Sequence, residues 1–125
     1  MQIFSIASQR AGWLAARLGV ISGNVANAST PGYRAREITP FTAALENRQV
    51  HMARTNPAHL NINGQAAQAG FEVREAPVAQ MTHSGNSVSL EKEMLDGAAT
   101  VRAYRLNTSI VRAYHRMFLM SLRNN

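Results

Sequence analysis

Apolar residues recur at alternating steps of four and three along the first part of the chain. They are Ala7, Ala11, Leu14, Leu18, Ile21, Val25 and Ala28. This heptad spacing predicts a helix over residues 3–28, with Leu14, Leu18, Ile21 and Val25 as its seam. A second stripe at the same spacing holds only small residues, namely Gly12, Ala16, Gly19, Gly23 and Ala26. Such small side chains allow a neighbouring helix to approach closely.

A turn is predicted directly after this helix, at Ser29-Thr30-Pro31-Gly32. Pro31 disfavours the helical conformation at Thr30, and a Pro-Gly pair is typical of the central positions of a type II turn. The first helix should therefore end here and the chain should change direction.

Residues 34–86 contain three of the four prolines and show no sustained period. Short alternations at Leu60-Asn61-Ile62 and Phe71-Glu72-Val73-Arg74 can form a β-hairpin, but two strands are marginally stable by themselves. We expect an irregular middle segment that is not a domain of its own.

A second and longer helix is predicted from about Ser89 to Arg123. Ser87 or Ser89 is the candidate N-cap, and Glu91, Glu93 and Asp96 follow near the positive end of the helix dipole. At 1.5 Å per residue this helix would be about 50 Å long.

Two apolar stripes run along the second helix with a cationic stripe between them. The first stripe consists of Ala99, Ala103, Leu106, Ile110, Ala113, Met117 and Met120, and of these Leu106, Ile110, Met117 and Met120 are the seam candidates. The second consists of Val101, Tyr104, Thr108, Val111, His115, Phe118 and Leu122. The basic stripe consists of Arg102, Arg105, Arg112, Arg116 and Arg123. One face is therefore cationic and both of its flanks are largely apolar.

These patterns predict a mainly α fold with three segments: an N-terminal helix and turn over 1–33, the irregular segment over 34–86, and a C-terminal helix over 87–125. The two terminal helices should form a coiled-coil-like pair. Because the second helix is apolar on two sides and the chain offers one other helix, one side lacks an intramolecular partner. Either other chains cover it within a helical polymer, which we expect, or the middle segment folds back over it.

The 125-residue chain carries a formal net charge of +6, and twelve of its thirteen basic residues are arginine. This charge suits an acidic partner, and arginine favours paired contacts at protein interfaces. The first residues lack the pattern of a cleavable signal peptide. The longest apolar stretch, residues 11–21, is interrupted by Arg17 and is too short for a membrane span.

Sites for chemistry are not evident in the sequence. The four histidines, His51, His59, His83 and His115, do not form the i, i+4 pair of zinc-binding helices, and there is no cysteine. No phosphate-binding loop, dinucleotide fingerprint or nucleophile elbow is present. We therefore expect a protein that is not an enzyme and has no catalytic, metal or cofactor site.

The segment from Ser22 to Arg36, SGNVANASTPGYRAR, resembles the N-terminal signature of the bacterial flagellar rod and hook family. The stretch TNPAHL at 55–60 and the stretch SGNSVSLEKEM at 84–94 are similar to the short proximal-rod members of that family. The residues that carry the resemblance are Asn24, Asn27, Thr30, Pro31, Gly32, Tyr33, Gly85, Asn86, Leu90, Glu91, Lys92, Glu93 and Met94. One departure is Ser89, where the family often has aspartate, which weakens the expected helix cap.

The resemblance implies a structural subunit of the flagellar basal body rod, exported by the flagellar type III apparatus and assembled in the periplasm. It also implies that the terminal helices form the inner, axial layer. The implied partners are other copies, other rod proteins, the membrane-ring protein and the ring-to-rod junction protein. Asn24 and Asn27 would bond neighbouring groups within the packed assembly, and residues 30–33 would redirect the chain outward.

Three alternatives remain open at this stage. The first is another axial subunit of the rod and hook family. The second is a helical protein whose arginine stripe binds nucleic acid, and the third is a peripheral membrane helix. Nucleic-acid binding would weaken steeply with salt. The two apolar stripes beside the arginines fit a membrane-surface helix poorly.

Overall fold

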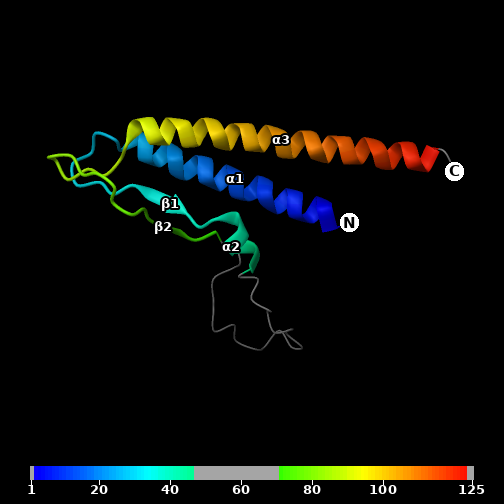
Figure 1. The fold of residues 1–125 in the computed structure, drawn as a ribbon, viewed down its shortest axis with the longest axis horizontal. Helices are drawn as coiled ribbons and strands as arrows, with labels where there is room; N and C mark the ends of the chain where they lie inside the picture. The colour runs from blue at the N-terminus through cyan, green and yellow to red at the C-terminus, as the bar shows by residue number, and fades with distance from the viewer. Residues whose placement is uncertain (1, 47–70, 124–125) are drawn as a thin grey trace, which may run out of the picture.

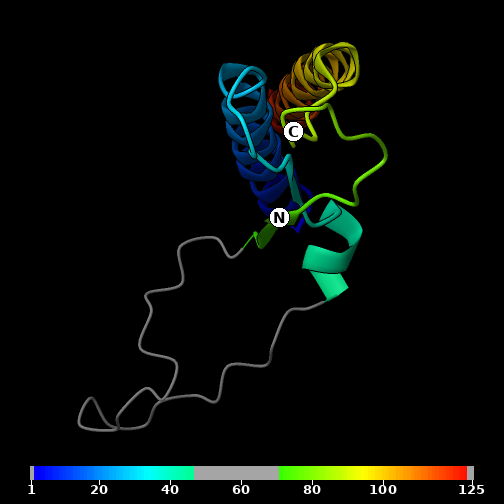
Figure 2. The ribbon, with the colours of Figure 1, turned by 90° about the vertical axis from the view of Figure 1, so that its left-hand side faces the viewer.

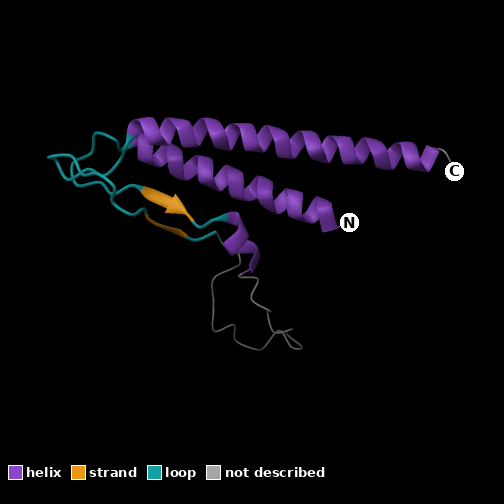
Figure 3. Ribbon diagram, in the orientation of Figure 1, coloured by secondary structure: helices purple, strands orange, loops and turns teal. Residues whose placement is uncertain are grey.

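The computed structural model describes residues 2–46 and 71–123, and this part of the chain is mainly helical. Its elements are α1 (Gln2–Ala26), β1 (Arg36–Ile38), α2 (Phe41–Glu46), β2 (Val73–Glu75) and α3 (Leu90–Arg123). Helices α1 and α3 lie side by side and antiparallel, and the short strands lie along the other side of α1 (Figures 1 and 3). The predicted fold class, with two long terminal helices, is confirmed.

The turns at the ends of the helices follow the predicted local chemistry. The Tyr33 N–H donates to the Thr30 carbonyl at 3.2 Å, and Gly32 has a φ of 72°, as the third residue of a type II turn requires. At the start of α3 the Glu93 N–H donates to the Ser89 carbonyl at 3.0 Å, which places Ser89 at the N-cap position. Ser87 does not cap the helix, because its hydroxyl accepts the N–H of Ala35 at 2.9 Å.

The core lies between α1 and β1. Trp13 and Leu14 of α1 are buried together with Ile38 of β1, and Phe41 packs against this cluster. The Trp13 indole N–H donates to the carbonyl of Thr39 at 2.8 Å, so the ring is anchored at its polar end as well. The strand segment is thereby fixed to the helix by both apolar contact and a hydrogen bond.

Strands β1 and β2 form a two-stranded antiparallel sheet in which Arg36 is opposite Glu75 and Ile38 is opposite Val73. The sequence predicted a strand at 71–74 paired with residues 60–62. The strand forms, but the partner that the structure shows is β1, about 35 residues earlier, and residues 60–62 lie outside the described part of the chain. An isolated pair of strands is marginal, and here docking of Ile38 on α1 supplies the missing support.

The residues through which α3 contacts α1 are mostly small or polar. Gly97 lies at Ile21, since a Cβ on Gly97 would be 3.6 Å from Ile21 Cγ2. Farther along, Thr100 and Asn107 are buried, and the Asn107 amide donates to the carbonyl of Ala7 at 2.9 Å. This line of contact passes between the two apolar stripes of α3. Ala103 of the first stripe packs against the Trp13–Leu14 cluster, but α1 leaves most of both stripes uncovered.

Consequently only part of the predicted seam is buried within the chain. Leu14 and Ile21 are buried, whereas Leu18 and Val25 are more than a third exposed. On α3 the four seam candidates, Leu106, Ile110, Met117 and Met120, are all between 42 % and 57 % exposed. Within a single chain, the apolar stripe of α1 and the first apolar stripe of α3 therefore do not face each other along their length. One reason is that α1 also directs Trp13 towards the sheet.

Helix α3 extends well past the N-terminal end of α1 (Figure 1). From the contact between Asn107 and Ala7, α3 continues for sixteen residues, while α1 continues for five to Gln2. The difference of about eleven residues corresponds to roughly 16 Å of helix. We name residues 113–123 the α3 overhang, and no other described element lies beside it.

Candidate functional site

Signature residues from the two ends of the chain meet at one end of the molecule. Residues 24–36, at the end of α1 and directly after it, and residues 82–88, which precede α3, are joined by hydrogen bonds there. This end faces the viewer in Figure 2, where one connecting segment can be followed from α1 to β1 and the other from β2 to α3. We call this arrangement the signature junction.

Asn24 is the polar link between α1 and β1. Its side chain is 1 % exposed, its amide donates to the carbonyl of Arg36 at 2.8 Å, and its oxygen accepts the N–H of Arg36 at 2.9 Å. The Tyr33 hydroxyl approaches the same oxygen at 3.4 Å, a weaker contact. The Asn24 side chain, although it belongs to a helix, therefore makes the same pair of hydrogen bonds to the β1 backbone that a neighbouring strand would make.

Asn86 forms the corresponding link from the C-terminal side. It is 2 % exposed, and its amide donates to the carbonyls of Asn27 at 2.9 Å and Thr30 at 2.7 Å. Its oxygen accepts the N–H of Val88 at 2.8 Å. One side chain thus satisfies carbonyls that the end of α1 leaves without helical partners, as a helix C-terminus requires.

Asn27 has a more local role than the other two asparagines. Its amide donates to the carbonyl of Gly23 at 2.8 Å, and its oxygen lies 3.2 Å from the Thr30 hydroxyl. Both partners lie within four residues of Asn27. The side chain therefore supports the end of α1 and the turn that follows.

Backbone bonds complete the signature junction. The Gly32 N–H donates to the Ser84 carbonyl, and the Ser87 N–H donates to the Tyr33 carbonyl, both at 3.0 Å. Gly85 has a φ of 79°, in the left-handed region that glycine adopts without strain, and lies against Gly32. The two loops therefore hold α1 and α3 at a fixed mutual position.

The signature residues at the start of α3 do not take part in this network. Leu90, Glu91, Lys92 and Met94 are exposed, whereas Glu93 is buried. Four side chains that carry the family resemblance thus lie on the molecular surface beside the signature junction, where another chain can reach them.

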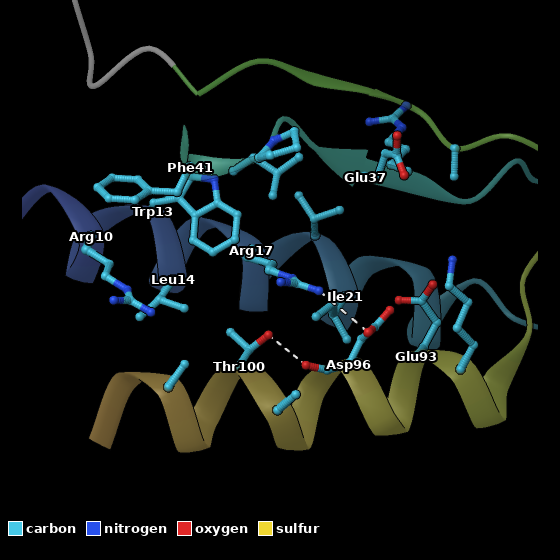
Figure 4. Close-up of a pocket in the computed structure, with 18 of the residues that line it drawn as sticks. Arg10, Trp13, Leu14, Arg17, Ile21, Glu37, Phe41, Glu93, Asp96 and Thr100 are labelled. Carbon is cyan, nitrogen blue, oxygen red and sulfur yellow. Dashed lines mark hydrogen bonds and ion pairs between the residues drawn. The ribbon is translucent and has the colours of Figure 1, made fainter. Parts of the chain in front are cut away.

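A groove of about 770 Å³ lies over α1, between the N-terminal half of α3 and the β1–α2 segment (Figure 4). Trp13, Leu14 and Phe41 line its apolar part. Arg17 crosses it, stacked 5.4 Å from the Trp13 ring centre and 3.5 Å from the Asp96 carboxylate. Residues of both charges line the groove, and among residues 2–46 and 71–123 no cluster of three potential metal ligands is present.

The predicted basic stripe lies on the surface. All five of its arginines, Arg102, Arg105, Arg112, Arg116 and Arg123, are exposed, and none of them forms an ion pair with another described residue. At 100° per residue, Arg105 and Arg116 lie about 160° and 180° around the axis from Asn107, which contacts α1. The stripe therefore faces away from α1.

Sequence reasoning missed two contributors to this arrangement. Trp13 carries the contact between α1 and the strands, and its only signal was its being the single tryptophan of the chain. Ser87 was considered only as a cap, although its hydroxyl holds the buried Ala35 in place.

Comparisons with known proteins find the same family that the signature residues resemble. A family described as "Flagella basal body rod protein" matches residues 7–34. The flagellar basal body rod protein FlgB of Agrobacterium fabrum is 42 % identical over 128 aligned residues, which cover 98 % of this chain and 94 % of that protein. The chain belongs to the FlgB family of flagellar basal body rod proteins. A second FlgB, from Aeromonas hydrophila, is 36 % identical, and the aligned region covers 62 % of this chain and 59 % of that protein.

Membership of the FlgB family confirms the resemblance inferred from residues 22–36 and 84–94, and it makes the chain a structural component of the flagellar rod. In the described part of the molecule, no helix has the length and apolar character needed to cross a membrane.

Proposed function

We propose that this FlgB-family chain acts without catalysis, as a rod subunit that polymerises through α1 and α3. The observation that supports this most strongly is the α3 overhang. Tyr114, Met117, Phe118, Leu119, Met120 and Leu122 lie in it, and all six are between 44 % and 60 % exposed. These residues lie on most of the helix circumference, and the remaining face carries Arg116 and Arg123, so the overhang needs neighbours on more than one side to cover its apolar surface.

The free energy available from covering the overhang is substantial. Full burial of one large apolar side chain is worth about 1.5–3 kcal/mol, and roughly half of each of these six surfaces remains exposed. Covering them would contribute about 4–9 kcal/mol in favour of association, before the entropic cost of bringing chains together. Exposed Ile3, Ile6, Leu18 and Ile110 add to this drive.

The signature junction gives this assembly a preformed building block. Because Asn24 and Asn86 fix the loops, α1 and α3 would pack against a neighbouring subunit as one rigid pair rather than as two separate helices. Less conformational entropy is then lost on association. Residues 34–46 and 71–81 project to one side of the pair, as expected for the outer part of a rod subunit (Figure 1).

Membership of the family supports finer assignments, which are part of this proposal. We assign the chain to the proximal part of the rod, where it crosses the periplasm and links the membrane ring to the rest of the rod. Its partners would be other rod proteins, the membrane-ring protein and the ring-to-rod junction protein. Delivery would be by the flagellar type III export apparatus.

Two seam substitutions test this function. Leu18→Asp and Ile110→Asp each place a charge on an exposed apolar position, so both should abolish rod assembly and motility while the protein is still exported. Ser109→Asp, next to Ile110 and also exposed, is the matched control and should leave motility close to normal. Full motility in both seam variants, or complete rods in cells that lack the gene, would show that the proposal is wrong.

A further inference from the structure

The outward face of α3 carries the same surface pattern twice, with opposite charge. Glu91 is followed at three and four residues by Met94 and Leu95, and Arg116 is followed at the same spacings by Leu119 and Met120. We call the first set the acidic patch and the second set the basic patch. Residues at i, i+3 and i+4 lie next to one another on a helix, so each patch is one charge beside two large apolar side chains.

Both patches are exposed to solvent. Met94 and Leu95 are 65 % and 73 % exposed, and Leu119 and Met120 are 51 % and 55 % exposed. Glu91 and Arg116 are also exposed, and neither forms an ion pair within residues 2–46 and 71–123. The chain therefore leaves two apolar surfaces and two opposite charges uncovered on one helix.

The two patches cannot meet within one molecule. They are separated by 25 residues, which is about 37 Å along the helix. The same 25 residues turn the helix by almost seven full turns, so the patches point in directions that differ by only about 20°. Each patch is therefore available to another chain on the same side of α3, the side away from α1.

We infer that the basic patch of one copy packs against the acidic patch of a second copy, with the two α3 helices parallel and displaced along their axes. This inference rests on the proposed self-association and specifies its geometry. Complementary charge and matching apolar pairs favour a second copy as the occupant. An anionic lipid surface would attract the basic patch but repel the acidic patch, and so would leave one of them uncovered.

Contact between unlike patches has a consequence for the assembly. Each copy that uses its basic patch still presents a free acidic patch, so association continues instead of stopping at a dimer. Such heterologous, head-to-tail contacts generate open chains or helical filaments unless the rotation closes a ring. The repeated pattern on α3 therefore orders the copies along the axis of the polymer.

Disulfide trapping in the full-length chain tests this contact, since the chain has no cysteine of its own. The variant Glu91→Cys/Arg116→Cys should give a ladder of covalent oligomers on oxidation. An intramolecular bond is excluded, because a disulfide needs Cα atoms within about 7 Å. Each single variant should give dimers at most. The matched control is Glu91→Cys/Ser121→Cys, whose second cysteine lies in the same overhang but about 140° around the helix from position 116.

Charge reversal provides a second test that needs no oxidation. Glu91→Arg and Arg116→Glu should each raise the concentration needed for self-association about fivefold, the upper end for an exposed ion pair. The double variant Glu91→Arg/Arg116→Glu should recover association, because the two patches are complementary again. Sedimentation velocity on the full-length variants measures this directly.

The outcomes separate this inference from the proposed function. Equal ladders from the double-cysteine variant and its control, or failure of the double reversal to recover association, would overturn the patch contact. If the same variants are still found in isolated rods, the proposed function stands while the inference fails. Flotation of the full-length chain with anionic vesicles, lost in Arg116→Glu and unchanged in Glu91→Arg, would also overturn it in favour of a lipid surface.

Discussion

Replacing Asn24 with alanine removes the side chain that joins α1 to β1. The amide and the oxygen of Asn24 pair with the carbonyl and the N–H of Arg36 at 2.8 Å and 2.9 Å. No other hydrogen bond to these two Arg36 groups is present in the described residues. The change therefore leaves one donor and one acceptor of the backbone unpaired, next to a position that is almost completely buried.

The expected loss of stability follows from these two groups. A buried polar group left without its partner costs about 1–3 kcal/mol. The Arg36 side chain is exposed, so water reaches part of this backbone and the sum falls towards the lower end, at about 2–4 kcal/mol. A domain whose described core has five buried apolar side chains has little stability in reserve, and a loss of this size should lower its unfolding midpoint strongly.

Urea unfolding followed by Trp13 fluorescence is a suitable assay, because this single tryptophan lies between α1 and the β1–α2 segment. The matched control is Asn27→Ala, which removes the same amide group from a site with only local partners and should cost less than about 1 kcal/mol. If Asn24→Ala unfolds at the same urea concentration as Asn27→Ala or as the unmodified chain, the role assigned to Asn24 is incorrect.

Three further predictions concern the signature junction and the assembly. Gly85→Ala should destabilise the chain by about 1–2 kcal/mol in thermal unfolding, because Gly85 has a positive φ, whereas Gly19→Ala, in open space within α1, should stabilise it by about 0.5–1 kcal/mol; effects of the same sign would contradict this. Ser87→Ala should cost about 1 kcal/mol through the lost bond to the Ala35 N–H, while Ser109→Ala should be nearly neutral, and the same urea assay compares them. Self-association measured by sedimentation should weaken as salt rises, since the patch contact includes exposed charges; an increase with salt would indicate a purely apolar contact.

The long elements of this fold were predictable because their causes are local. The heptad spacing from Ala7 to Ala28 gives α1 within two residues at each end, and Pro31-Gly32 gives the turn and its type. The start of α3 at Leu90 follows from Ser89 and the acids behind it. In each case a few neighbouring residues determine the conformation, so no knowledge of distant contacts is required.

The contact between the helices was not predictable in the same way. A search for apolar periods finds Leu106, Ile110, Met117 and Met120, yet within one chain α1 packs against Gly97, Thr100 and Asn107. Small and polar residues allow close approach and satisfy their own hydrogen bonds, but they leave no hydrophobic signal. The apolar stripes are visible as a sequence period, and this fits contacts with other chains rather than with α1.

The candidate site divides similarly. The pairing of Asn24 with Arg36 and of Asn86 with Asn27 joins segments that no local pattern connects, and only the family resemblance singled these residues out. The strand pairing of 36–38 with 73–75 was missed because register between short strands depends on the docking of Ile38 against Trp13.

The central claim is that like-built neighbours cover the surface that α1 and α3 leave exposed. The most direct measurement is the maleimide reactivity of Phe118→Cys, in the middle of the α3 overhang, in the free chain and in isolated rods that contain the variant. We expect rapid labelling of the free chain and labelling of the rods slowed at least about tenfold. Arg34→Cys, at an exposed position between α1 and β1, is the control and should be reactive in both. Equal labelling of Phe118→Cys in the free chain and in the rods would contradict the account.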